Sequence, residues 1–323
     1  CQAAGILRER AGDPAGAAEI LLRALDLLPA ERDVLLALID AYGAMGEHEK
    51  AIDAISRVLL VHPDDPWLYR SRAALHDALG QGELVVADLQ EAYDKSGGGY
   101  ASELTAALER AVAQAAGRSS ERPLRLRLAE LLGKSGEVDR ARAELTELTR
   151  TDGKDRAALR ALAALEDAQQ SWDAAAAIYR RLLPLEDGDA LVDIALHLAL
   201  VCEQLGRPGD ARAALERALR AAPDHPALRE RLRVVYNVTG AVHELAGMIL
   251  EDAAAAPDAA ARFTHLLHAG RLLLEDGNEP ARAVAVIEEA RALRPDEQET
   301  TLLLAEAYAV GGRIPQARAL LDT

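Results

Sequence analysis

Residues 95–100, Lys-Ser-Gly-Gly-Gly-Tyr, place three glycines directly before a helical pattern. A glycine-rich loop at a helix start can hold phosphate, because its backbone amides point at the anion. A P-loop also requires a Lys-Ser or Lys-Thr pair after the glycines and a strand before them. Here the preceding segment is helical up to Asp94 and no such pair follows, so we interpret the run as a break between helices and expect no cofactor.

Histidine and cysteine are the other residue types that could carry chemistry. His265 and His268, in the sequence HLLH, share a helix face, but a zinc site needs three or four ligands and Glu275 is the only nearby candidate for a third. We therefore interpret both as groove or surface histidines. The segment HELAG at 243–247 lacks the second histidine of a zinc-protease helix, and Cys202 lies on an apolar stripe typical of a core residue. We expect no catalytic site, no metal and no enzyme activity.

The composition narrows the classes of partner. The chain has 323 residues, a net charge of −16 and a pI near 5.0, which argues against nucleic acid or an anionic membrane as partner. No apolar run approaches the roughly 20 residues of a membrane span. Half of the residues are apolar and only 3% are aromatic, with alanine and leucine, both strong helix formers, dominating. The bias toward alanine and arginine is typical of a bacterial protein.

Cys1 and Cys202 are far apart and give neither metal spacing nor a disulfide framework, so a reducing, cytoplasmic location is the simpler interpretation. The alternative is that Cys1 is the lipid-bearing first residue of a mature lipoprotein, which would place the protein in the periplasm or on a lipid anchor. Helical periodicity begins within a few residues of Cys1, however, where a lipoprotein normally has a tether. This favours a fragment of a longer chain.

A sequence motif recurs along the chain. The segments 12–29, 46–63 and 206–223 each begin with glycine, have alanine five residues later and end with proline, and 277–295 repeats the motif with one extra residue. Successive turn positions are separated by 34, 34, 56, 34, 36, 34, 38 and 34 residues. These turn positions are Gly12, Gly46, Gly80, Gly136, Gln170, Gly206, Gly240, Asn278 and Gly312.

Each unit is predicted to be a pair of amphipathic helices. Before the turn, Leu35, Leu38, Ile39 and Tyr42 form one apolar stripe at helical spacing. The turn residue accepts the left-handed backbone that ends a helix, and proline ends the second helix. Small residues stand where the two helices must approach closely. These are Ala17, Ala51, Ala141, Ala175, Ala211, Ala283 and Ala317.

The 34-residue period and the spacing of apolar, alanine and proline positions resemble the tetratricopeptide repeat (TPR) family. The resemblance covers nearly the whole chain in about nine repeats. It implies an all-α solenoid of stacked antiparallel helix pairs, wound as a right-handed superhelix with a concave groove lined by the first helices. The unit at 226–257 departs from the pattern, because Arg233 replaces a small residue and Leu245 replaces the packing alanine.

The step of 56 residues marks a break in the array. Its additional 22 residues hold roughly one helix, near 102–116. We therefore expect an N-terminal array at 1–96, with about three repeats of which the first is incomplete. A joint at 97–121 with one extra helix follows, and then a C-terminal array at 122–323, with about six repeats of which the last is incomplete. Whether the joint is a hinge or a rigid packed helix stays open.

The resemblance also implies which residues face the groove. Acidic residues predominate among them, so we expect a basic protein or peptide partner. Lysine occurs at only four positions, which disfavours the Lys and Asn carboxylate clamp known in the family. Trp67 is a candidate anchor or an ordinary packing residue between first helices. The groove candidates are Asp33, Leu36, Asp40, Trp67, Arg70, Asp77, Arg160, Asp167, Asp193, Leu196, Glu203, Asn237, His265, His268, Glu299 and Glu306.

The sequence therefore predicts a non-enzymatic scaffold that binds peptide or protein partners in a concave groove and assists complex assembly. One alternative is a regulatory or targeting TPR segment of a larger enzyme. Another is a lipid-anchored envelope assembly factor.

Overall fold

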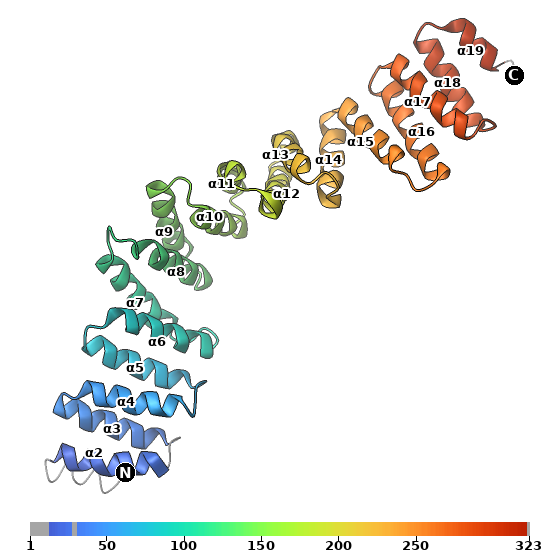
Figure 1. Ribbon diagram of the computed structural model, residues 1–323. Helices are drawn as coiled ribbons and strands as arrows, with labels where there is room; N and C mark the ends of the chain where they lie inside the picture. Colours follow the sequence, from blue (N-terminus) through green and yellow to red (C-terminus); the bar gives the residue numbers. More distant parts are fainter. Residues whose placement is uncertain (1–12, 28–30, 322–323) are drawn as a thin grey trace. The chain divides into compact units, whose positions relative to one another are not determined.

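The computed structural model describes residues 13–27 and 31–321, and within them it is all-α (Figure 1). Gly12, Pro29 and Cys1 lie outside the described residues, and so do the expectations attached to them. Over residues 14–151 and 172–321, helices that follow one another in the chain pack against one another, which confirms the predicted fold of sequential helix pairs. The chain divides into two compact units, Cys1–Ala161 and Leu162–Thr323.

The first unit holds eight complete helices among its described residues, and α10 (Arg156–Ala168) begins in it. The eight are α2 (Pro14–Leu27), α3 (Arg32–Met45), α4 (His48–Leu59), α5 (Pro66–Ala78), α6 (Gly82–Lys95), α7 (Ala101–Gln114), α8 (Glu121–Lys134) and α9 (Val138–Thr151). The first helices of its pairs are α3, α5 and α8. Helix α7 lies in the segment of the expected joint and packs against both α6 and α8.

The second unit continues the alternation of first and second helices. Its elements after α10 are α11 (Trp172–Leu182), the short 3₁₀ helix η1 (Leu183–Leu185), α12 (Gly188–Gln204), α13 (Pro208–Ala221), α14 (Pro226–Thr239), α15 (Val242–Ala254), α16 (Ala259–Glu275), α17 (Pro280–Leu293), α18 (Gln298–Val310) and α19 (Ile314–Leu321). The first helices here are α12, α14, α16 and α18, and each is followed by its partner.

The turn residues adopt the backbone conformation that the repeat predicts. Every one from Gly46 to Gly312 has positive φ, including the two that are not glycine, Gln170 at 56° and Asn278 at 49°. At Gly46 the amide of the next residue, Glu47, donates to the carbonyl of Tyr42 at 2.9 Å. This bond satisfies a carbonyl at the end of α3 and turns the chain back toward α4.

The core of each unit runs between the paired helices. All seven alanines predicted at close approaches are buried, from 0% exposed at Ala51 to 7% at Ala317. A methyl group lets two helix axes come near one another, and leucine and isoleucine from the next turns fill the space on either side. Cys202 is a free, fully buried cysteine in this core, and burial raises the pKa of its thiol. It is a packing residue, as the sequence predicts.

The glycine run ends α6 and precedes α7. Gly97 and Gly98 have φ of 65° and 103°, and Tyr100 also has positive φ. An L side chain is strained in this region of backbone space, so two of the three glycines are needed for the turn itself. The run is a turn between helices.

Candidate partner-binding site

Fourteen of the sixteen groove candidates lie on these first helices, the other two, Arg160 and Asp167, lie on α10, and none of the sixteen is buried. Side-chain contacts show how much of their charge is already paired. On α5, the Nε of Arg70 donates to Glu103 at 3.3 Å, and Asp77 accepts from Arg110 at 2.8 Å. Both partners lie on α7. Two of the three candidates on α5 are thus held by ion pairs with a neighbouring helix.

The same pairing occurs in the second unit. Glu203 of α12 accepts from Arg231 of α14 at 2.7 Å, and Glu299 of α18 is paired with Arg271 of α16. Asp167 is hydrogen-bonded by the hydroxyl of Tyr179, whose pKa is raised, first by burial and then by this bond. Asp40 and Arg160 also have polar partners.

These pairings leave fewer free carboxylates among the groove candidates than a count of their acidic residues suggests. Among the described residues no ion pair involves Asp33, Asp193 or Glu306, and all three are exposed. Their carboxylates are the ones available to a basic partner. Leu36 is 45% exposed, and Leu196 is half-buried between neighbouring core positions of α12.

Trp67 is half-buried, and its ring is covered by a cation. The guanidinium of Arg32 lies 5.5 Å from the ring centroid and also donates to Asp65 at 2.8 Å. Asp65 in turn accepts from the backbone amide of Trp67 at 3.1 Å and begins α5. These contacts describe the packing between first helices that the sequence offered as one of two interpretations of Trp67.

Three of the candidates share a pocket. Asn237 on α14 and His265 and His268 on α16 line a hollow of about 500 Å³ in the second unit. The floor is formed by α15, which lies behind the two first helices. The full lining is Arg233, Val234, Asn237, Leu245, Ile249, Asp252, His265, His268 and Leu272.

The pocket exists where the repeat departs from its own pattern. In the unit that contains Gly46, the equivalents of Arg229, Arg233, Leu245 and Asp252 are packing residues. Leu35, Ile39, Ala51 and Val58 occupy those positions. The departures at Arg233 and Leu245 were visible in the sequence as breaks in the pattern. The charges at Arg229 and Asp252 are the same kind of signal at two further packing positions.

Three charged side chains replace apolar packing between α14 and α15. Asp252 accepts from Arg229 at 2.8 Å and is also paired with Arg233. Arg229 reaches Glu251 at 3.2 Å as well. Helices α14 and α15 pack less extensively than α12 with α13 or α16 with α17, and about as extensively as α3 with α4. Side chains of α14, α15 and α16 line the hollow.

The hollow combines hydrogen-bonding groups with an apolar floor. Asn237 and the two histidines can each donate and accept hydrogen bonds, and Arg233 carries a cation beside them. Leu245 and Ile249 provide an apolar floor. A concave, mostly apolar surface with a few convergent polar groups is the usual form of a ligand site.

No three His, Cys, Asp or Glu side chains in residues 13–27 and 31–321 are grouped as metal ligands would be. Over the same residues, none of the helices combines the length and the apolar character needed to cross a bilayer.

Models of known protein families match most of the chain. Three models, each described as tetratricopeptide repeat, match residues 10–75 and 273–323, residues 192–232, and residues 126–190. Together they cover well over half of the sequence, so the chain belongs to the tetratricopeptide repeat family. Domains of this family generally mediate protein–protein interactions, and no catalytic domain is evident in the part that the structure describes.

Solved structures match this chain at low identity. "Structure of Naa15/Naa10 bound to HypK-THB" is 17% identical with a TM-score of 0.34, and the match covers 99% of this chain and 56% of that one. YrrB, titled a TPR protein with an unusual peptide-binding site, is 17% identical with a TM-score of 0.37, covering 60% of this chain and 95% of that one.

A TPR protein from Parabacteroides merdae is 16% identical with a TM-score of 0.28, and the match covers 95% and 96% of the two chains. Identities and TM-scores this low carry no information on function. The search of curated proteins finds no match.

Proposed function

We propose that this chain is a non-enzymatic scaffold that binds a peptide segment of a protein partner and helps assemble a complex. The observation that carries the proposal is the α14–α15–α16 pocket, in which Asn237, His265 and His268 meet beside Arg233. These side chains belong to first helices, which the family resemblance predicts to carry the partner contacts. Their charges and hydrogen-bonding groups are directed into a hollow that helix packing alone does not require.

The pocket suits one apolar side chain of an extended peptide. Leu245, Ile249 and Leu272 can surround such a side chain, while Asn237 and His268 hydrogen-bond the peptide backbone beside it. Beyond the pocket, the exposed carboxylates of Asp193 and Glu306 favour basic residues on the same partner, since complementary charge raises specificity and the association rate. Binding spread over several repeats compensates for modest affinity at each.

Affinity capture from the source cell tests this function. The full chain is compared with Asn237→Ala/His268→Ala and with a matched control, Arg220→Ala, an exposed residue of α13 outside the pocket. A third arm carries Trp67→Ala/Asp33→Ala. Bound proteins are identified by mass spectrometry, and the peptide from the partner is then titrated by calorimetry.

A partner lost from the double variant and kept by Arg220→Ala supports the pocket. A partner lost only from the Trp67→Ala/Asp33→Ala arm would move the site to the first unit. If no protein is enriched by the wild-type chain, the scaffold function itself is contradicted.

A further inference from the structure

Side-chain contacts between helices two apart define two rows in the first unit. Arg70 with Glu103, and Asp77 with Arg110, each pair α5 directly with α7 across 33 residues of sequence. Helix α7 therefore takes the position that the first helix of the next repeat would take beside α5.

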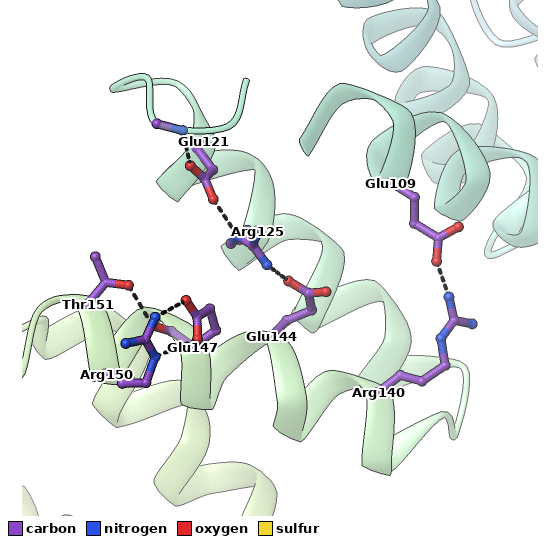
Figure 2. A network of polar contacts seen from close by, with 9 residues as sticks. Glu109, Glu121, Arg125, Arg140, Glu144, Glu147, Arg150 and Thr151 are labelled. Carbon is purple, nitrogen blue, oxygen red and sulfur yellow. Dashed lines mark hydrogen bonds and ion pairs between the residues drawn. The ribbon is translucent and has the colours of Figure 1, made fainter. Parts of the chain in front are cut away.

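On its other side, α7 is tied to a helix of the opposite kind. Glu109 of α7 is paired with Arg140 of α9, which is the second helix of its pair (Figure 2). In the other row, Arg127 of α8 donates to the amide oxygen of Gln90 on α6 at 2.8 Å. Helices α5, α7 and α9 thus form one row, while α6 and α8 belong to the other.

The single inserted helix exchanges the two rows. Before α7, the first helices α3 and α5 share a row. After it, the first helix α8 lies in the row of α6, which is a second helix. One helix added to an alternating stack must have this effect, because antiparallel packing continues without a gap. The surface across α6 and α8 is therefore made of one helix of each kind, and the regular repeat has no equivalent of it.

This mixed surface contains a hollow of about 360 Å³ over α7. Its apolar floor is formed by Val86, Ala111, Ala115 and Leu124. The hollow is deep because the two alanines have small side chains. Polar residues form the rim. The full lining is Gly82, Glu83, Val86, Ala87, Ala111, Gln114, Ala115, Arg118, Ser120, Pro123, Leu124 and Arg127.

The rim carries two cations that no carboxylate of the described residues neutralises. Arg127 bonds the uncharged Gln90, and Arg118 makes no ion pair within residues 13–27 and 31–321. Arg125, on the same helix as Arg127, shows the contrast, because Glu121 and Glu144 both accept from it (Figure 2). The lining holds these two arginines against one carboxylate, Glu83, so its charge is net positive in a chain whose net charge is −16.

We propose that the α6–α7–α8 hollow is a second binding site, and that it takes an acidic peptide segment whose apolar side chain is flanked by Asp or Glu. The apolar side chain occupies the floor between Val86 and Leu124, and the flanking carboxylates meet Arg118 and Arg127. Charge complementarity selects this occupant. It differs from the partner of the α14–α16 pocket, so the chain holds two different segments, one on each unit.

Fluorescence anisotropy with the full chain and three labelled peptides tests the proposal. The probe is a ten-residue peptide with two adjacent leucines flanked by glutamates on both sides. In the first comparison peptide lysine replaces every glutamate, and in the second alanine replaces both leucines. We expect the probe to bind about tenfold more tightly than either. The chain's overall negative charge works against this result, so only a local site produces it.

Two variants locate the binding. The variant Arg118→Glu/Arg127→Glu is expected to bind the probe about tenfold more weakly. The control variant Arg217→Glu/Arg220→Glu makes the same charge change on α13 and is expected to bind the probe as the wild type does. Ala87→Trp fills the hollow from an exposed position without altering charge and is also expected to abolish binding. Circular dichroism checks that each variant is folded.

Equal binding of the glutamate and lysine peptides would overturn the proposal. Undiminished binding by the Arg118→Glu/Arg127→Glu or the Ala87→Trp variant would do the same. Loss of binding in these variants together with unchanged capture through the α14–α16 pocket would show that the two sites are separate.

Discussion

Arg233 and Asp252 form an ion pair across α14 and α15, at two positions that in the pair α3 and α4 are occupied by Ile39 and Val58. Arg229 joins the same carboxylate at 2.8 Å. The interior of this helix pair is therefore charged at positions that are apolar in α3 and α4. Desolvating such charges costs free energy, and Arg233 and Asp252 line the pocket of the second unit.

Removing the shared carboxylate should destabilise the second unit. In Asp252→Ala, Arg229 and Arg233 lose their common partner while remaining largely covered, so we expect a loss of about 1–3 kcal/mol in the free energy of unfolding. Urea denaturation followed by circular dichroism measures it. Glu230→Ala, which removes a longer and more exposed contact to Arg233, is the control. Equal losses in the two variants would contradict the role given to Asp252.

Replacing all three charges should separate stability from binding. The variant Arg229→Leu/Arg233→Ile/Asp252→Val restores the residue types of the repeat that contains Gly46. Exchange of a buried ionic cluster for apolar packing is often neutral or stabilising by a few kcal/mol, so the melting temperature should stay level or rise. The same change closes the hollow, and partner capture should be lost. A variant that melts lower than the wild type would show that the ionic cluster is required for the packing of α14 with α15.

Acid should weaken the junction between α8 and α10. The hydrogen bonds from Arg122 hold the pKa of the Asp155 carboxyl below its ordinary value of about 4, with help from the amide of Ala158. Because the folded pKa is the lower one, this stabilisation is complete above pH 4 and is lost as pH falls through the folded value.

Asp155→Asn should therefore lower the urea midpoint at pH 7 and make little difference near pH 3. Asp139, whose side chain is 97% exposed, provides the control as Asp139→Asn. A difference between wild type and Asp155→Asn that stays constant from pH 7 to pH 3 would show that the carboxylate does not contribute in its ionised form.

The glycine run should be intolerant of side chains for a conformational reason. Gly98 has φ of 103°, so Gly98→Ala is expected to cost on the order of 1 kcal/mol through backbone strain. Gly43 lies inside α3 with open space around it, and Gly43→Ala should instead stabilise by about 0.5–1 kcal/mol. Thermal melting distinguishes the two. A stabilised Gly98→Ala protein would mean that this turn does not require left-handed backbone.

The proposed joint at 97–121 makes a different prediction. Leu108 of α7 is 0% exposed, so Leu108→Ala should cost about 2–5 kcal/mol if α7 is packed as a structural part of the stack. Glu109→Ala removes only a partly exposed ion pair to Arg140 and should cost much less, because solvent screens such a pair. Hydrogen exchange of α7 amides, measured in both variants, reports whether the helix opens separately. Small and equal costs would favour a hinge over a rigid joint.

The sequence by itself determined the helix pairs, their boundaries and their common register. Turn residues such as Gly46 and packing alanines such as Ala51 act within one repeat, and their spacing of five residues carries the information directly. Two departures from the repeat pattern also marked the unusual unit. Arg233 replaces a small residue, and Leu245 replaces the packing alanine. Local backbone preference and close helix approach depend on residues near in the chain, so a single sequence shows them.

Only the tertiary structure decided which side chains meet between repeats. Asp77 forms an ion pair with Arg110, and Glu203 forms one with Arg231, each about 30 residues away in sequence. Such pairs depend on the rotation of each helix and the reach of each side chain, which periodicity does not encode. The exchange of rows at α7 has the same origin. A helix prediction for residues 102–116 says nothing about which row the helix joins, because that is settled by packing against α6 and α8.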